Sequence, residues 1–400
     1  MKKQPIQAEI SIGVVGHVDH GKTSLVKALT EEWADTHSEE IKRGITIKLG
    51  YADADIVYCD ECKCHTTNKL CRDKHGGKFV RKVSFVDCPG HETLMAIMLS
   101  GAAIMDGAML IVAANEKCPQ PQTIEHLSAL NIAGIKNIIV VQNKVDLVTK
   151  EQAKEHSRQI KEFLKGSVAE NAPIIPVAAH YNINIEKVVE AIQTHIKTPV
   201  RNADSGLMMY IARSFDINKP NTDIKKLVGG VIGGSIIEGT AKIGDKIEIA
   251  PGVLENGVYR KIETEIASLS VKEGRIDRAT AGGLVGIGTP LDPYLTKGDS
   301  LVGNVVGTPG KLPPVLSEAE VDVHLLERVV GFDKVEGLKK SEMLVINFGT
   351  GTTVGVVDRV KGEKVWLNFK KPICVKKGGK IAISRRSATR WHLIGYGIVK

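Results

Sequence analysis

One stretch near the N-terminus constrains this chain more than any other feature. Residues 16–23 read Gly-His-Val-Asp-His-Gly-Lys-Thr, which fits the pattern G-x-x-x-x-G-K-[ST] of a phosphate-binding loop. An apolar run at 10–15 precedes it as a predicted strand, and a helical pattern at 23–29 follows it. Glycines let backbone N–H groups approach phosphate oxygens, and the helix N-terminus adds a positive dipole end. The chain is therefore predicted to bind a ligand that carries phosphate.

The side chains of this loop have predicted roles of their own. Lys22 can reach the β- and γ-phosphates of a nucleotide, and the Thr23 hydroxyl can ligate Mg²⁺. A chance match in a glycine-rich turn is the alternative, but the strand before and the helix after the loop count against it. The other predicted nucleotide contacts in this stretch are Asp19, His20, Gly21 and Ser24.

A second motif, Asp87-Cys88-Pro89-Gly90-His91, directly follows the predicted strand 83–86. An aspartate at the carboxyl end of a strand can hold Mg²⁺ through water. Gly90 lets its amide approach a γ-phosphate without a side-chain clash. Alone, this sequence would equally suit a plain turn, but beside the first loop it favours a nucleotide site.

A third motif, Asn143-Lys144-Val145-Asp146, follows the predicted strand 138–141 and selects the base. A carboxylate such as that of Asp146 accepts hydrogen bonds from guanine N1–H and the exocyclic amino group, and adenine has no such pair of donors. Leaving a buried polar group unpaired is costly, so the discrimination can be large. We therefore expect GTP and GDP as ligands, with an exposed turn as the alternative interpretation of the motif.

The two halves of the chain have different patterns. In the first half, short apolar runs alternate with helical patterns, which predicts βαβ units and a mostly parallel sheet. The predicted strands are 10–15, 83–86, 108–113, 138–141 and 174–177, and the predicted helices are 23–29, 92–99, 122–133, 150–164 and 185–196. In the second half, where most of the 40 glycines lie, short β-branched runs between turn signals predict small all-β barrels.

Length and composition fit this division. A chain of 400 residues exceeds what one core usually holds, and 42% hydrophobic with 25% charged residues excludes wholesale disorder. Breaks near 197–206 and 309–314 predict three domains, at 1–200, 206–312 and 313–400. The net charge of +8 favours a polyanionic partner without proving one.

Targeting segments are absent from the sequence pattern. The longest apolar stretches, such as 107–114, are too short to span a bilayer, and residues 1–9 lack the apolar run of a signal peptide. We therefore expect a cytoplasmic protein with no membrane partner.

Four of the seven cysteines lie within thirteen residues. In a reducing compartment such clustering indicates metal binding rather than disulfides. The pairs Cys59-x₂-Cys62 and Cys71-x₃-His75 lie in the segment 59–77 and can surround one tetrahedral Zn²⁺. Cys64 and His65 are alternative fourth ligands. We call the segment 59–77 the cysteine knuckle, and the competing interpretation is that it no longer binds metal.

The three nucleotide motifs, in this order, resemble those of the GTPases, and His20 and His91 within them are typical of translation factors. The stretches 210–220 and 243–249, together with the cysteine-rich insert, resemble the gamma subunits of archaeal translation initiation factor 2. The resemblance covers nearly the whole chain. It implies an α/β P-loop GTPase domain followed by two all-β barrel domains.

The resemblance also implies roles for individual residues. Gly44 and Thr46, in Arg-Gly-Ile-Thr, match the first switch, which would place Thr46 at Mg²⁺ and the γ-phosphate with Asp19 nearby. His91 matches the residue that orients the attacking water, assisted by Lys22 and Asp87. The segment Ala178, Ala179 and His180 matches a loop that touches the guanine, with Ala178 in place of the usual serine. In the knuckle, Lys74 stands where the family has its fourth cysteine, and His75 is the nearest substitute.

A protein-synthesizing GTPase, which hydrolyses GTP to GDP and phosphate, is the implied activity. The implied partners are the initiation factor 2 alpha and beta subunits, methionyl initiator tRNA and the small ribosomal subunit. Alternatives are an elongation-type or selenocysteine-specific aminoacyl-tRNA carrier and the GTPase subunit of a sulfate-activating enzyme. The cysteine insert and the stretch 212–218 count against both tRNA-carrier alternatives.

Overall fold

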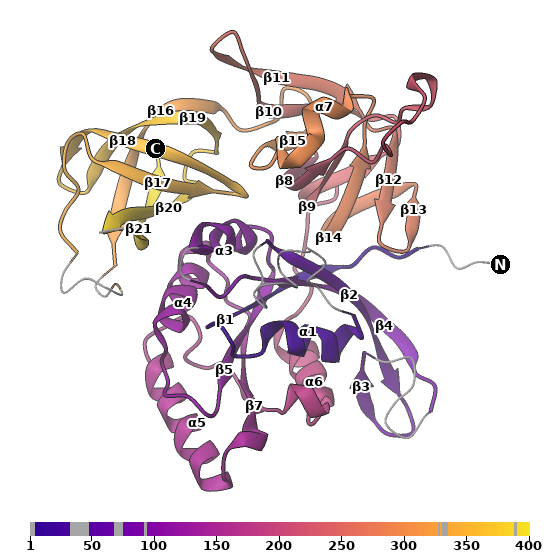
Figure 1. The fold of residues 1–400 in the computed structure, drawn as a ribbon, viewed down its shortest axis with the longest axis vertical. Helices are drawn as coiled ribbons and strands as arrows, with labels where there is room; N and C mark the ends of the chain where they lie inside the picture. Colours follow the sequence, from indigo (N-terminus) through magenta and orange to yellow (C-terminus); the bar gives the residue numbers. More distant parts are fainter. Residues whose placement is uncertain are drawn as a thin grey trace. The chain divides into compact units, whose positions relative to one another are not determined.

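The computed structural model describes residues 5–32, 48–67, 75–91, 94–326, 329, 335–387 and 390–400. The chain divides into two compact units, one built on Ala8–Pro199 and the other mainly on Val200–Glu327 and the C-terminal residues that follow. Figure 1 draws the first unit in indigo to magenta and the second in rose to yellow.

A seven-stranded sheet forms the centre of the first unit, in the order β3-β2-β4-β1-β5-β6-β7. The strands β4, β1, β5, β6 and β7 run parallel, whereas β2 is antiparallel to both of its neighbours. The bounds are β1 (Ile10–Gly16), β2 (Gly50–Cys59), β3 (Cys64–Thr66), β4 (Lys78–Asp87), β5 (Gly107–Ala113), β6 (Ile138–Asn143) and β7 (Ile174–Pro176).

Helices cover both faces of this sheet, with α1 and α6 together on one face and α3 and α4 on the other (Figure 1). Strands covered in this way are mostly apolar, and every residue of β1, β5 and β6 is buried. The helices are α1 (Lys22–Thr30), α3 (Met95–Ala102), α4 (Pro121–Ala133), α5 (Lys150–Leu164) and α6 (Ile185–His195).

The predicted strands and helices of this unit are confirmed, with shifted ends. The helix expected over 92–99 begins at Met95 and runs to Ala102, and residues 92 and 93 lie outside the described residues. The three nucleotide motifs follow the carboxyl ends of β1, β4 and β6. Because these strands are parallel, the motifs lie along one edge of the sheet, where ligands of such sheets bind.

The second unit begins with an antiparallel sheet of eight strands, in the order β11-β10-β15-β8-β9-β14-β12-β13. One apolar cluster contains residues from opposite ends of this order, including Ile262 of β11 and Leu269 of β12, so the sheet curls around a single core. The strands are β8 (Met208–Phe215), β9 (Val231–Lys242), β10 (Lys246–Glu255), β11 (Val258–Glu265), β12 (Ser268–Val271), β13 (Gly274–Ile276), β14 (Arg278–Gly288) and β15 (Val305–Gly307). A short helix, α7 (Pro293–Thr296), packs on β8 and β9.

The remaining strands form a closed barrel in the order β16-β19-β18-β17-β20-β21. They are β16 (Val315–Leu325), β17 (Met343–Phe348), β18 (Gly351–Lys361), β19 (Lys364–Cys374), β20 (Lys380–Ser387) and β21 (Arg390–Val399). The Thr350 hydroxyl donates to the carbonyl of Ile211 at 2.7 Å, and Cys374 packs with Ala250 and Val305. These contacts join the barrel to the eight-stranded sheet.

The predicted fold class, an α/β GTPase-type domain followed by two β domains, is confirmed. Strand β15 ends at Gly307 and β16 begins at Val315. We keep 206–312 and 313–400 as the proposed limits of the two β domains, and 1–200 for the first domain. Among the described residues, no helix combines the length and apolar character needed to cross a bilayer.

Candidate functional site: a nucleotide-binding edge and a cysteine knuckle

The phosphate loop connects the end of β1, at Gly16, to the start of α1, at Lys22. Its backbone has positive φ angles at Gly16 (143°), Asp19 (62°) and Gly21 (87°). A Cβ atom on Gly21 would lie 2.3 Å from Nδ2 of Asn143. Glycine is therefore required there both by the left-handed backbone and by the close approach of the third motif.

The second motif lies directly on the phosphate loop. A Cβ atom on Gly90 would lie 2.3 Å from Nζ of Lys22 and 2.9 Å from the Gly16 carbonyl oxygen. Lys22 is buried, and its ammonium donates to the carbonyl of His17 at 2.8 Å. The two glycine-containing loops and this lysine thus form one packed group, as the sequence predicts.

Thr23, predicted to ligate Mg²⁺, meets Asp87, predicted to hold the ion through water. The Thr23 hydroxyl donates to Oδ2 of Asp87 at 2.7 Å, and the Asp87 side chain is fully buried. Asp19 is exposed in the loop, and Ser24 is half-buried at the start of α1. Gly44 and Thr46, predicted for the first switch, lie outside the described residues.

His91 is half-buried at the end of the second motif, and its carbonyl accepts a hydrogen bond from the Leu94 amide at 2.9 Å. This bond precedes α3, so the backbone of His91 helps to start the helix. Its predicted role in orienting water stays a prediction.

Asn143 connects three loops of the site. Its amide Nδ2 donates to the carbonyl of His20 at 2.9 Å, and its Oδ1 accepts from the Ala179 amide at 3.1 Å. The side chain is buried at the carboxyl end of β6. The third motif therefore contributes hydrogen bonds that hold the site's loops together, and its base selectivity stays a prediction.

The residues predicted to contact guanine surround the Asn143 side chain. Asp146 is exposed, and Lys144 before it has a left-handed backbone with φ of 59°. Ala178 exchanges backbone hydrogen bonds with Ile183, at 3.3 and 3.1 Å. Ala179 is buried, Val145 is half-buried, and His180 is exposed. The Ala178 backbone thus forms a closed turn without the serine hydroxyl that the family pattern contains.

The ring of His20 does not face the loop's exposed side. Its Nδ1 lies 3.0 Å from the carbonyl oxygen of Ile111, and its Nε2 lies 3.3 Å from Oε2 of Glu116. Burial lowers the pKa of His20 to about 4, although Ile111 and Glu116 oppose the shift. The ring is therefore neutral at pH 7, and its contact with Glu116 is not an ion pair despite the short distance.

Sequence reasoning missed a second histidine beneath the phosphate loop. Nδ1 of His126, on α4, accepts a hydrogen bond from the Gly16 amide at 2.8 Å. The two residues are 110 positions apart, and no pattern in the sequence pairs them. The contact depends on how α4 packs against β1, which only the structure shows.

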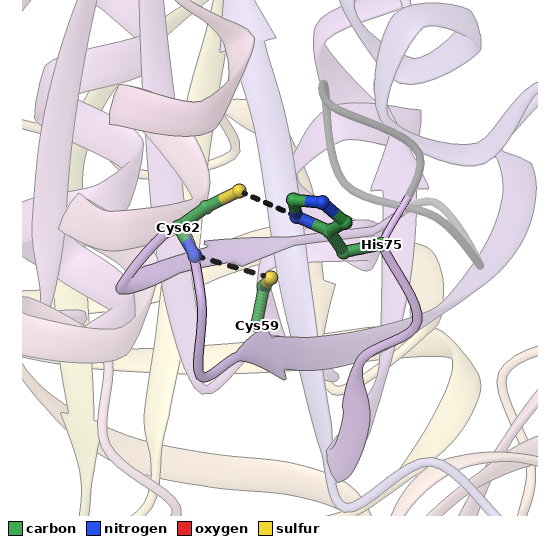
Figure 2. A group of neighbouring side chains, drawn as sticks. All are labelled: Cys59, Cys62 and His75. Carbon is green, nitrogen blue, oxygen red and sulfur yellow. Dashed lines mark hydrogen bonds between the residues drawn. The ribbon is translucent and has the colours of Figure 1, made fainter.

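Three of the four predicted zinc ligands come together in the knuckle (Figure 2). The sulfur atoms of Cys59 and Cys62 and a ring nitrogen of His75 all lie within 4.8 Å of one another. Sγ of Cys62 lies 3.4 Å from Nδ1 of His75, and the Cys62 amide donates to Sγ of Cys59 at 3.3 Å. Two sulfurs and one imidazole suit zinc better than a hard cation, so the residues fit this metal.

The fourth ligand remains a prediction, because Cys71 lies outside the described residues. The alternatives differ in their surroundings. Nδ1 of His65 contacts Oε2 of Glu190 on α6 at 2.7 Å, so this ring is engaged away from the sulfurs. Cys64 pairs with Cys59 across the β2–β3 ladder but is not among the three clustered ligands.

Comparison with protein families identifies both ends of the chain. The family model described as the elongation factor Tu GTP binding domain matches residues 7–198, and the model described as initiation factor eIF2 gamma, C terminal, matches residues 317–399. The translation initiation factor 2 subunit gamma of Pyrococcus furiosus is 55% identical over 407 residues, covering 100% of this chain and 99% of that protein. The protein of the same name from Methanocaldococcus jannaschii is 54% identical with the same coverage.

Solved structures of translational GTPases share the fold. A bacterial selenocysteine-specific elongation factor, EF-Sec, has a TM-score of 0.76 and 25% identity, covering 98% of this chain and 58% of that chain. The elongation factor SelB of Methanococcus maripaludis, in complex with the GTP analogue GppNHp, has a TM-score of 0.74 at 22% identity. Full-length identity above one half to the initiation factor subunits, against one quarter to the elongation factors, disfavours the carrier alternatives. The chain belongs to the gamma-subunit family of translation initiation factor 2 and is a GTP-binding translation initiation factor.

Proposed function

We propose that this chain carries methionyl initiator tRNA to the small ribosomal subunit when GTP is bound, and releases it after GTP hydrolysis. It acts in the cytoplasm as one subunit of a trimer with initiation factor 2 alpha and beta subunits. One observation carries the proposal. The loops of the three nucleotide motifs, here called the nucleotide edge, contact one another in a chain that matches initiation factor gamma subunits along its full length.

Selectivity for guanine is assigned to Asp146. The buried Asn143 holds the base-side loops together, and Asp146 follows three residues later on the exposed side, where a ligand can reach it. The carboxylate accepts two hydrogen bonds that only guanine among the common bases offers at these positions. The backbone of Ala178, Ala179 and His180 forms the other wall of the base site.

Mg²⁺ fits the pair formed by Thr23 and Asp87. Their oxygen atoms are 2.7 Å apart in a partly buried position, and hydroxyl and carboxylate oxygens are the donors that this ion prefers. When bound, the ion would neutralise phosphate charge. Gly44, Thr46 and Asp19 are the further residues we assign to its surroundings.

For hydrolysis we assign His91 to orient the attacking water toward the γ-phosphate. Lys22, held beside Gly90, places its ammonium where negative charge develops on the phosphate oxygens, and Asp87 holds the Thr23 hydroxyl in place. His91→Ala should slow GTP hydrolysis while leaving the tRNA affinities in the GTP and GDP forms unchanged. If the variant instead loses tRNA binding, His91 has a different role.

We also propose one structural Zn²⁺ in the knuckle, held by Cys59, Cys62, Cys71 and His75. The support is the cluster of three ligand atoms and the short polar sequence of residues 59–77, which predicts little apolar core. The matched relatives are initiation factor subunits, which disfavours the sulfate-activation alternative.

The choice of tRNA tests the function. The trimer, loaded with a non-hydrolysable GTP analogue, is titrated with methionyl initiator tRNA and with methionyl elongator tRNA at one fixed salt concentration. We expect a clear preference for the initiator. Equal affinity for both would contradict the proposal and favour an elongation-type carrier.

A further inference from the structure

His126 lies on the buried face of α4 and is only 1% exposed. Its Nδ1 accepts the hydrogen bond from the backbone N–H of Gly16, which is both the last residue of β1 and the first glycine of the phosphate motif. One side chain of α4 therefore holds the point at which the strand turns into the loop.

The direction of this hydrogen bond determines which nitrogen of the His126 ring carries the proton. The Gly16 N–H is the donor, so Nδ1 must carry no proton, and the neutral ring holds its proton on Nε2. Burial, together with the nearby Lys22, His17 and His20, lowers the pKa of His126 to about 3. The ring is thus a neutral acceptor across the physiological pH range.

Gly16 has little freedom to find another partner. Its φ is 143°, and a Cβ atom there would lie 2.3 Å from the carbonyl oxygen of Ile111 on β5. The same carbonyl lies 3.0 Å from Nδ1 of His20, further along the loop. If the acceptor on α4 were removed, a buried N–H would lose its partner, and the loop would have to shift to satisfy it.

We propose that His126 is a positioning residue that holds the phosphate loop in its nucleotide-binding shape before the nucleotide arrives. The inference deepens the proposed function and rests on its claim that the loop binds GTP and GDP. A loop that spends less time in the competent shape binds more weakly in proportion to that fraction, because the apparent dissociation constant rises by its inverse.

Two substitutions separate the hydrogen bond from the volume of the ring. His126→Leu removes the acceptor and keeps an apolar side chain, whereas His126→Asn places an amide oxygen near the position of Nδ1. With a fluorescent GDP analogue and the full-length chain at 25 °C, we expect affinity to fall on the order of 10-fold in His126→Leu. His126→Asn should recover most of the loss.

His156→Leu is the matched control. His156 is similarly buried, at 4% exposed, in the same unit, and its Nδ1 lies 3.0 Å from Nε2 of Gln142 rather than near the loop. We expect it to lower the melting temperature as His126→Leu does and to leave GDP affinity within about twofold, since it leaves the Gly16 acceptor in place. Equal GDP affinity in the wild type and His126→Leu would overturn the proposal, as would equal weakening in the control.

A ¹⁵N spectrum of histidine-labelled protein gives a test that needs no variant to fold. We expect His126 to show an unprotonated Nδ1 and a protonated Nε2 from pH 6 to 8. A proton on Nδ1 would overturn the proposal. Failure of this inference is distinct from failure of the proposed function, because wild-type protein that binds no guanine nucleotide refutes the function itself.

Discussion

The nucleotide edge and the cysteine knuckle belong to the same unit, but they are held together in different ways. At the nucleotide edge, buried side chains of β6 and α4 bond to the backbone of the phosphate loop. In the knuckle, three potential ligands lie at the end of a hairpin whose second strand has three half-buried residues. The protein's own hydrogen bonds order the first region, whereas the second brings together three side chains that suit the proposed zinc.

The largest expected effect concerns the base. Asp146→Asn removes the acceptor pair for guanine, so GTP affinity should fall about 100-fold or more. Xanthosine triphosphate should gain affinity, because its 2-oxo group needs the donor that asparagine supplies. Titrations with both nucleotides decide this, and unchanged GTP binding would remove Asp146 from the site.

The next largest effect is expected from the two side-chain hydrogen bonds of Asn143. Asn143→Ala leaves the His20 carbonyl and the Ala179 amide without their side-chain partner, which should weaken GDP binding by on the order of 30-fold. Asn131→Ala, at an exposed position on α4, is the matched control and should bind GDP normally. If the two variants bind equally well, the edge does not depend on this hydrogen-bonded tie.

Acid should weaken the nucleotide-site unit through His126. Its pKa is lowered from the ordinary 6.5 to about 3, so the unfolded chain takes up a proton that the folded chain refuses. This stabilisation is complete above pH 6.5 and is lost as pH falls, by about 2 kcal/mol between pH 7 and pH 5. Urea unfolding at both pH values measures it. In His126→Asn the difference between the two pH values should shrink by about this amount.

Metal removal should have the smallest effect on the whole unit. Protein purified without chelators should contain about one Zn per chain, and chelation should expose the knuckle amides to hydrogen exchange while the phosphate loop stays protected. We expect a decrease in melting temperature of only about 2–4 °C. A metal-free chain with fully protected knuckle amides would contradict the zinc proposal. Loss of metal in Cys64→Ala but not in His75→Ala would move the fourth ligand.

The nucleotide edge could be predicted from the sequence because its motifs are local. The strand, loop and helix around Lys22 lie within one continuous stretch, and the parallel order of the strands brings the Asp87 and Asn143 loops to the same edge. The contact of Thr23 with Asp87 and the cluster of Cys59, Cys62 and His75 agree with what spacing and ligand chemistry predicted.

The buried hydrogen bonds that support the phosphate loop could not be predicted from the sequence. The bond from Gly16 to His126 and the turn of the His20 ring toward Ile111 and Glu116 depend on how α4 and β5 pack, not on any periodicity. The ring of His20 faces the interior, and the contact of this residue with the nucleotide stays a prediction. Histidines in a nucleotide motif can therefore act by bracing the loop.

The account's central claim is that the state of the nucleotide controls tRNA binding. The most direct test measures the affinity of the trimer for methionyl initiator tRNA, at fixed salt, with a non-hydrolysable GTP analogue and with GDP. A coupling of roughly 1–3 kcal/mol predicts binding about 5- to 150-fold tighter with the GTP analogue. Equal affinity in the two nucleotide states would contradict the account.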